Sequence, residues 1–167
     1  EGMTKGGFYW TVNGQTDKMG EYKDGHGNTT VNKIDSKSYG VKLGQKFDDK
    51  ADINVSYSRY KLDYGRPETG SSMMGPTIFI VGMTDGKKDN TKYTVAFDYK
   101  FNDKLSNRLT YFSRTSDLDD DTNHPASLWL MREKTWGFSE ELTYANGNHT
   151  IVGGYDYYKD AMNKYQD

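Results

Sequence analysis

The chain has 167 residues, and only 34% of them are hydrophobic, which leaves little material for a compact water-soluble core. Its 22 basic and 24 acidic residues nearly balance, so no basic field suggests a nucleic-acid partner. The lack of cysteine excludes disulfides and thiolate metal sites. No run of about 18 apolar residues predicts a transmembrane helix, so only a barrel of strands could cross a bilayer.

Alternation of apolar and polar residues with a period of two predicts the first two strands. They cover residues 7–17 and 36–47, and a polar, glycine-containing loop at 18–33 joins them. Lys42 and Lys46 share the polar face of the second strand with small residues. Strands with two such different faces suit a membrane barrel that has lipid on one side and water on the other.

A short polar turn at 48–50 introduces a third strand, in which the odd-numbered residues from Ile53 to Tyr57 are apolar. From Tyr60 onward the apolar residues are even-numbered instead. This change of phase indicates either a β-bulge or a strand that has left the membrane, and we favour the second. Pro67 is expected to end the strand, because proline cannot donate to a ladder, and a loop should run from 65 to about 90.

Inside that expected loop, residues 76–83 are apolar on both faces, unlike the other candidate strands. The segment is either an extra strand of the loop, or it packs against its own loop or caps the lumen. Contact with a ligand through Met73, Met74 or Phe79 is a further alternative.

The clearest hairpin covers residues 92–114, where a polar turn at 102–104 separates two alternating strands. Its apolar face is rich in aromatic residues, and its polar face carries Asp98, Lys100 and Arg108. This combination is typical of a strand with lipid outside and an aqueous lumen inside.

A third polar loop is expected at 117–134, followed by a strand at 135–145. Glu140 interrupts the apolar face of that strand, which counts against a strictly lipid-facing assignment because a carboxylate in hydrocarbon is costly. Asn146-Gly147 predicts a two-residue hairpin turn into the last strand, at 149–159.

The predicted fold class is all-β: about seven strands of an antiparallel up-and-down transmembrane β-barrel. Short turns near residues 48, 103 and 146 alternate with the three long loops, and in outer-membrane barrels such turns are periplasmic and such loops extracellular. Seven strands leave two open edges, so residues 1–167 are expected to form part of one incomplete barrel domain. Because the chain opens on glutamate with no signal segment, we expect an internal piece of a longer protein.

Three stretches resemble the early-to-middle barrel strands of TonB-dependent outer-membrane receptors: DKMGEYKDG at 17–25, the strand, Asp-Asp-Lys turn and strand at 36–67, and DYKFNDKLS at 98–106. The family implies a barrel of about 22 strands with an N-terminal plug domain, located in the cell outer membrane of Gram-negative bacteria. Such receptors take up ferric siderophores, haem or cobalamin. The implied partners are outer-membrane lipid, a small-molecule ligand such as an iron chelate, the plug of the same parent chain, and TonB through that plug; the plug and remaining strands are not among these residues.

Aromatic and cationic residues beyond the outer strand ends are the candidate ligand-binding residues, because an anionic chelate could meet guanidinium and aromatic faces there. They are Tyr22, Tyr64, Arg66, Trp129 and Arg132. The alternative is an aromatic girdle at the membrane interface, or plain loop packing. A second set should face the lumen and touch water or the plug: Lys42, Lys46, Asp98, Lys100, Arg108 and Glu141.

We expect neither an enzyme nor a cofactor, because no nucleophile elbow, phosphate loop, metal-protease helix or paired-carboxylate pattern occurs. Residues 117–123 offer oxygen ligands at alternate positions, as a calcium loop does. Thr122 and Leu128 stand where such a loop needs glycine and glutamate. A solvated acidic loop is therefore the preferred interpretation, and no metal site is expected.

Two other functions remain open. A passive porin or a small outer-membrane adhesin barrel shares the alternation of turns and loops but has no plug. A soluble lipocalin-like binding barrel would instead point the apolar face, with Val95 and Phe97, into its own interior.

Overall fold

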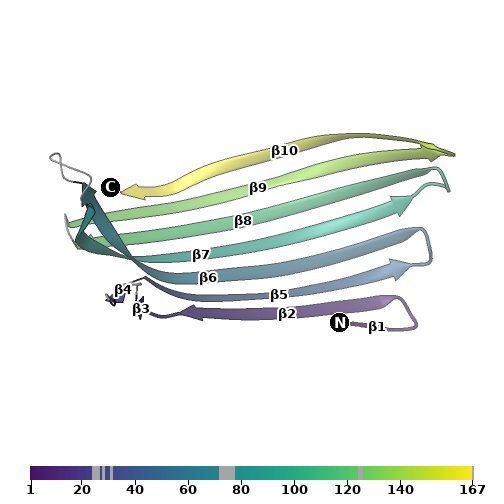
Figure 1. Ribbon diagram of the computed structural model, residues 1–167. Coiled ribbons are helices and arrows are strands. Elements are labelled where there is room, and N and C mark those ends of the chain that lie inside the picture. Colours follow the sequence, from purple (N-terminus) through teal and green to yellow (C-terminus); the bar gives the residue numbers. More distant parts are fainter. Residues whose placement is uncertain (24–26, 28, 31, 72–77, 124–125, 167) are drawn as a thin grey trace.

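The computed structural model describes the whole chain except residues 24–26, 28, 31, 72–77, 124–125 and 167. The described residues form one eight-stranded antiparallel sheet and a separate two-stranded sheet (Figure 1). No helix in the described part of the chain is long and apolar enough to cross a membrane. The predicted all-β fold class is confirmed.

The main sheet follows chain order, so each long strand pairs with the next long strand. Its strands are β1 (Gly2–Met3), β2 (Phe8–Met19), β5 (Lys33–Phe47), β6 (Ala51–Ser71), β7 (Ile78–Lys100), β8 (Leu105–Asn123), β9 (Ala126–Asn146) and β10 (His149–Gln166). The small sheet pairs β3 (Tyr22–Lys23) with β4 (Thr29–Thr30). The seven predicted strands correspond to β2 and β5–β10. The strand order runs from β1 to β10 without closing, as in an incomplete barrel.

The three predicted short turns are confirmed, and they lie together at one end of the sheet, which we call the turn end (Figure 1). In the turn between β7 and β8, the Asn102 side-chain oxygen accepts hydrogen bonds from the backbone N–H groups of Lys104 (2.9 Å) and Leu105 (3.0 Å). Gly147 takes a φ of +59°, the left-handed conformation that an Asn-Gly turn needs. Local side-chain chemistry therefore defines this end.

At the opposite end, which we call the loop end, two of the three predicted long loops are wrong. β6 and β7 stay paired as far as Ser71 opposite Ile78, where the sequence predicts a loop at 65–90. β8 and β9 pair as far as Asn123 opposite Ala126, inside the loop predicted at 117–134. Polar and charged residues occur on both faces of these extensions, so the apolar alternation that identifies a strand is weak although the backbone ladder continues.

Pro67 does not end its strand, contrary to the prediction. It lies opposite Met83 in the ladder between β6 and β7. On the other side of β6, β5 begins at Lys33 opposite Gly65, so within the described residues Pro67 pairs with β7 only. Proline is tolerated at such an edge, because a residue there need not donate a hydrogen bond toward the open side.

The change of phase at Tyr60 is not a bulge, so that alternative is wrong. β6 keeps one register with β5 from Ala51 to Gly65, and with β7 from Ala51 to Glu68. A register shift occurs only later, between Glu68 and Thr69. The apolar side chains therefore change from one face to the other along a continuous strand.

The doubly apolar segment belongs to a strand. Residues 78–81 begin β7, with Ile78 opposite Ser71 and Ile80 opposite Thr69. The suggested ligand contacts through Met73, Met74 and the Phe79 side chain lie outside the described residues and side chains.

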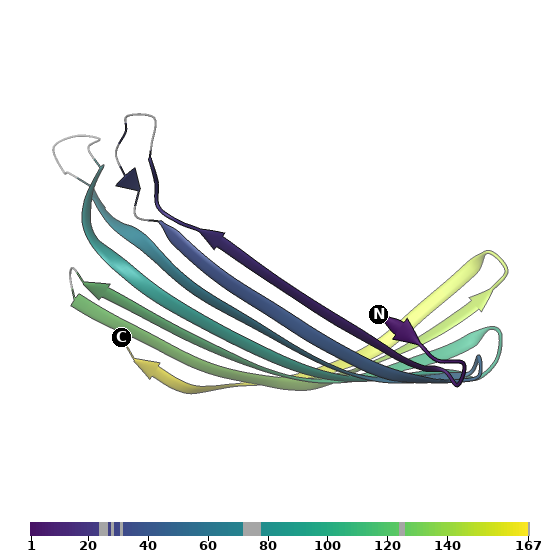
Figure 2. The ribbon, with the colours of Figure 1, turned by 90° about the horizontal axis from the view of Figure 1, so that it is seen from below.

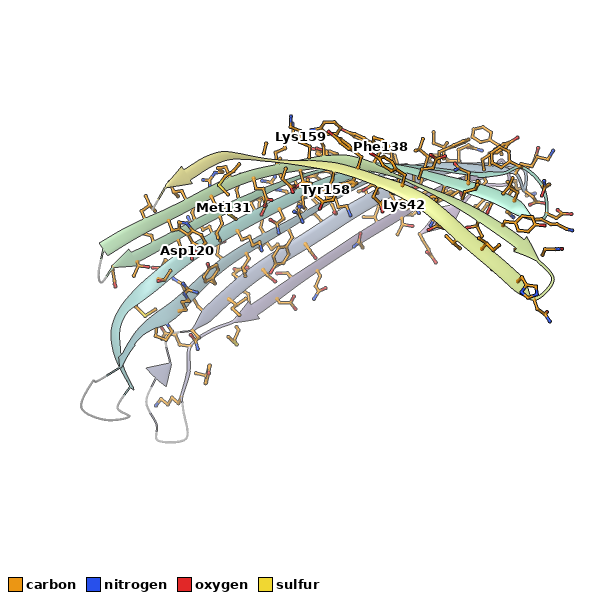
Figure 3. All side chains as sticks on the ribbon, turned by 90° about the horizontal axis from the view of Figure 1, so that it is seen from above. Lys42, Asp120, Met131, Phe138, Tyr158 and Lys159 are labelled. Carbon is orange, nitrogen blue, oxygen red and sulfur yellow. The ribbon has the colours of Figure 1, made fainter. Side chains whose placement is uncertain are left out.

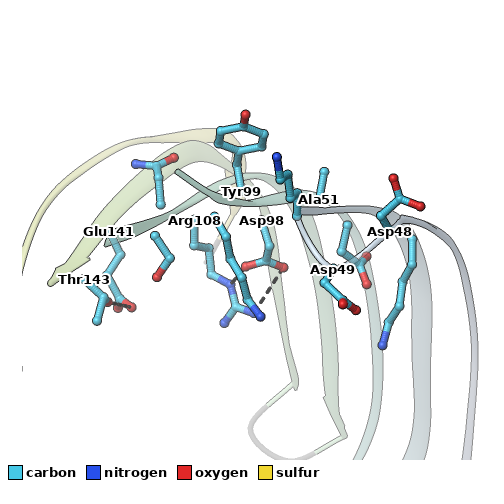
Figure 4. Close-up of a pocket in the computed structure, with 14 residues that line it drawn as sticks. Asp48, Asp49, Ala51, Asp98, Tyr99, Arg108, Glu141 and Thr143 are labelled. Carbon is cyan, nitrogen blue, oxygen red and sulfur yellow. Dashed lines mark hydrogen bonds and ion pairs between the residues drawn. The ribbon is translucent and has the colours of Figure 1, made fainter. Parts of the chain in front are cut away.

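The main sheet is a single curved layer with side chains projecting from both faces (Figures 2 and 3). We call the face that carries Asp98, Arg108 and Glu141 the inner face and the face that carries Tyr99 the outer face. Figure 4 shows these two sets on opposite sides of the arched sheet, with the inner face on the concave side. Among the described residues no apolar side chain is buried. The apolar surface of this chain is therefore exposed on the sheet and does not form a core.

Candidate functional site

The outer face carries a continuous apolar band toward the turn end. One row of residues, paired from strand to strand across all the long strands, is entirely apolar or aromatic: Trp10, Leu43, Val55, Val95, Tyr111, Phe138 and Tyr157. Each of these side chains belongs to a residue that is between 37% and 50% exposed. Contiguous apolar surface of this extent marks contact with a membrane, a ligand or another protein.

Aromatic residues mark both edges of the apolar band. Toward the loop end, the ring centroids of Tyr57 and Tyr93 are 5.0 Å apart, and Tyr39 lies 6.1 Å from Tyr57. At the turn end, the rings of Tyr99 and Phe101 are 5.1 Å apart. At about 3.3 Å per residue the band extends about 26 Å along β7 from Tyr93 to Phe101. At a strand tilt of ~40° this is about 20 Å of height, near the ~25 Å apolar band of outer-membrane barrels.

Glu140 lies within the apolar band, between Leu109 and Tyr155 in the ladder. Its Oε1 accepts a hydrogen bond of 3.0 Å from Asn107 Nδ2. Glu140 shares the row of Phe97 and Leu109, midway between the two aromatic edges, and Asn107 belongs to the next row toward the turn end. A carboxylate at this level is costly in hydrocarbon, so Glu140 is the residue of the band that least suits contact with lipid.

Beyond the aromatic edge, toward the loop end, the same outer face becomes charged. Arg59 and Asp89 form a double ion pair with distances of 2.9 and 2.5 Å, and Lys61 Nζ lies 3.7 Å from the same carboxylate. The hydrogen bonds from Arg59 lower the pKa of Asp89. On the neighbouring strands Arg132 lies 3.7 Å from Asp117. The outer face thus changes from apolar to ionic along the strands.

The inner face near the turn end carries a charged cluster, and all six residues that the sequence assigns to a lumen share this face: Lys42, Lys46, Asp98, Lys100, Arg108 and Glu141. Arg108 donates to Asp98 through Nε (2.6 Å) and Nη2 (3.3 Å). Tyr9 donates to Asp52 at 2.7 Å, and Lys42 Nζ lies 5.6 Å from the Tyr9 ring. All six except Lys42 line a hollow of about 450 Å³ (Figure 4).

Near the loop end the inner face turns apolar and aromatic. One row contains Met19, Ile34, Tyr64, Gly86, Asp120 and Trp129, and the next row toward the turn end contains Leu62, Lys88, Leu118 and Met131. We call the apolar and aromatic members of these two rows the inner-face patch. The two faces therefore exchange polarity near Tyr60, which accounts for the change of phase in the sequence.

Tyr64 of the inner-face patch makes a polar pair with Asp120, which lies in the same row. The Tyr64 hydroxyl donates a hydrogen bond to Asp120, a residue that is only 7% exposed. Burial and this hydrogen bond raise the pKa of Tyr64 to about 12. Arg66 Nη2 lies 3.7 Å from the other carboxylate oxygen of Asp120. The Tyr64 ring lies over Gly86, where any side chain would collide with it.

The structure brings together three of the five predicted ligand residues. Tyr64, Arg66 and Trp129 share the inner face at the loop end, and Asp120 lies opposite Trp129 in the ladder. Sequence reasoning missed Asp120, because it belongs to an acidic run that reads as a solvated loop. The position of Asp120 carried a signal, because alternate residues of an extended strand face opposite sides and an even-numbered residue lies on the same face as Leu118.

The other two predicted ligand residues lie apart from this group. Arg132 is an odd number of positions from Trp129, so it is on the outer face, where it binds Asp119 and lies near Asp117. Tyr22 belongs to β3 in the small sheet and is 50% exposed.

The described residues contain no group of three or more histidine, aspartate or glutamate side chains placed to hold a metal ion. The arrangement can present an apolar band to an apolar medium, a charged cluster to water or a polar partner, and an aromatic patch to a small molecule. Comparison with known proteins finds no matching family model, curated protein or solved structure.

Proposed function

We propose that this chain forms part of the wall of a transmembrane β-barrel in a bacterial outer membrane. The observation that supports this most strongly is the outer face, which is apolar between two aromatic edges and ionic beyond one of them. A water-soluble sheet would need a second layer to cover the band, whereas lipid covers it directly. The charged cluster on the inner face near the turn end would then meet an aqueous lumen or a plug domain.

A charge placed at the centre of the band tests the membrane-facing assignment. Val95→Arg should destabilise the bilayer-inserted protein by about 2–4 kcal/mol, the cost of an arginine facing lipid near the midplane. Ala96→Arg is the matched control, because it adds the same charge one residue away on the inner face. Unfolding by denaturant from phosphatidylcholine vesicles gives both free energies. Equal stability of the two variants would reject the assignment.

Within this class, we propose an uptake receptor of the TonB-dependent type for a ferric siderophore, haem or cobalamin. The support is the resemblance of three sequence stretches to that family, together with the inner-face patch, where Trp129, Tyr64 and Arg66 could contact an aromatic or anionic ligand. A passive porin with a water-filled lumen has no need of such a patch. The plug of such a receptor would contact the charged cluster around Arg108, and TonB would act through the plug.

Tryptophan fluorescence tests the uptake proposal, with ferric citrate, haem and cyanocobalamin as probes. One of them should quench the reconstituted protein, and Trp129→Phe should remove most of that quenching. Trp136→Phe is the control, because Trp136 belongs to the outer face beside the band. No quenching by any probe, or equal loss in both variants, would favour a passive porin or an adhesin.

A further inference from the structure

Basic side chains gather on the outer face just beyond the aromatic edge of the band. Lys37 on β5 lies directly opposite Lys61 on β6 in the ladder. In the next row toward the turn end, Arg59 lies opposite Tyr39. Like charges directly opposite each other destabilise a strand pair. The Lys61 side chain is 48% exposed, so this pair is open to an external anion.

The carboxylate nearest to this group is already shared. Asp89 accepts both hydrogen bonds from Arg59 and lies 3.7 Å from Lys61 Nζ. Within the described residues Lys37 makes no ion pair. On β5, β6 and β7, the two rows nearest the band therefore hold three cations for one carboxylate.

Acidic residues return only in the following row toward the loop end, where Asp35 lies opposite Asp63. Asp35 is paired with Lys18 at 3.2 Å, and Lys87 stands opposite Asp63. From β2 to β7 that row holds two lysines for two carboxylates, so these residues do not neutralise the excess beside the band.

The opposite part of the sheet carries a smaller cationic excess at the same level. Asp117 and Arg132 lie opposite each other on β8 and β9, and Arg132 also binds Asp119. In the row of Arg59, Lys134 lies opposite Thr115, so these two rows hold two cations for one carboxylate on β8 and β9, against three for one on β5, β6 and β7.

We propose that Lys37 and Lys61 bind the phosphate of a lipid headgroup whose acyl chains lie on the apolar band. Lys37 lies one row beyond Tyr39 and Lys61 two rows beyond Tyr57, just outside the band edge, the level that aromatic residues and headgroups share at a membrane interface. Thr16, opposite Lys37 in the ladder, adds a hydroxyl donor on the same face. This inference rests on the proposed membrane function.

Spin-labelled lipids in electron paramagnetic resonance test the inference on the protein reconstituted in phosphatidylcholine. The motionally restricted signal measures the association of labelled phosphatidic acid relative to labelled phosphatidylcholine. Phosphatidic acid should be preferred, and Lys37→Gln with Lys61→Gln should reduce the preference by about 5-fold per lysine, as expected for ~1 kcal/mol per basic residue near anionic lipid.

The matched control is Lys88→Gln with Lys92→Gln, which removes the same charge from β7 on the inner face. This control variant should keep the preference for phosphatidic acid over phosphatidylcholine. Restricted lipid without a preference for phosphatidic acid, or an equal loss in both double variants, would overturn the headgroup site and leave the membrane proposal standing. No restricted lipid of either kind would overturn the membrane proposal itself.

Discussion

Tyr64 allows the inner-face patch to be measured through a single group among 14 tyrosines. Its pKa of about 12 in the folded chain lies above the ordinary value of 10.0. The neutral phenol is therefore favoured by folding, so its contribution to stability is complete below pH ~10 and is lost as the pH rises through about 12. Subtracting the alkaline tyrosinate titration of Tyr64→Phe from that of the unchanged protein should leave a transition near pH 12. A difference centred on 10.0 would contradict the hydrogen bond to Asp120.

Gly86 provides a second test at the same place. In Gly86→Ala the new methyl group would collide with the Tyr64 ring and displace its hydroxyl from Asp120. We expect the transition that belongs to Tyr64, isolated by subtracting the titration of Gly86→Ala with Tyr64→Phe, to move toward the ordinary value while the sheet still forms. Gly153→Ala is the control, because a side chain there would meet nothing within 4 Å. An unchanged late transition in Gly86→Ala would show that the ring does not lie over this glycine.

At the scale of the element, the ion pair between Arg59 and Asp89 links the extensions of β6 and β7 beyond the band. Asp89→Asn should speed amide exchange in these extensions by up to about fivefold, since a partly exposed pair contributes ~0.2–1 kcal/mol. The pKa of Asp89 is lowered by Arg59, so the pairing is present above its ordinary pKa of 3.8 and is lost as the pH falls through the lowered value. Exchange near Val95, within the band, should not change. Faster exchange along the whole of β7 would contradict this local role.

The turn end could be predicted from sequence because its signals are local. Asn102 and Asn146-Gly147 carry their turn chemistry in the residues themselves. The strand extensions could not be predicted, because beyond Tyr60 neither face is uniformly apolar. The effect of Pro67 could not be predicted either, since it depends on where the neighbouring strand begins, and the described part of β5 begins at Lys33, opposite Gly65.

In the candidate site, too, local features could be predicted from sequence and features that depend on strand pairing could not. Residue type alone was enough to single out Tyr64, Arg66 and Trp129. Their place on one face depends on four strands, β6 to β9, being extended and in register. In a loop, sequence spacing does not decide which side a residue faces, so Arg132 could not be separated from this group. In a strand, its spacing from Trp129 places it on the other face. Tyr64 on β6 and Asp120 on β8 are separated by β7. The Tyr64 ring can pass over β7 to reach Asp120 because the residue between them is a glycine, Gly86.

At the scale of the whole molecule, the described part of the chain has no buried apolar side chain and its sheet does not close. We therefore expect the isolated 167-residue chain to aggregate or stay poorly folded in plain buffer, and to disperse in detergent. Sedimentation velocity with and without detergent measures this. A monodisperse chain that unfolds cooperatively in plain buffer would mean that the band is covered by protein.

Because the two faces exchange polarity along it, β7 carries a lipid-facing, an inner-facing and a water-facing position on one strand. Spin labels placed singly at Val95, Ala96 and Asp89, in the protein reconstituted in lipid, report collisions with oxygen and with a water-soluble nickel reagent. We expect Val95 to be accessible to oxygen, Ala96 to be poorly accessible to oxygen, and Asp89 to be accessible to nickel. Val95 shielded from both reagents, with Ala96 open to nickel, would indicate a soluble barrel with its apolar face inward and would contradict the membrane assignment.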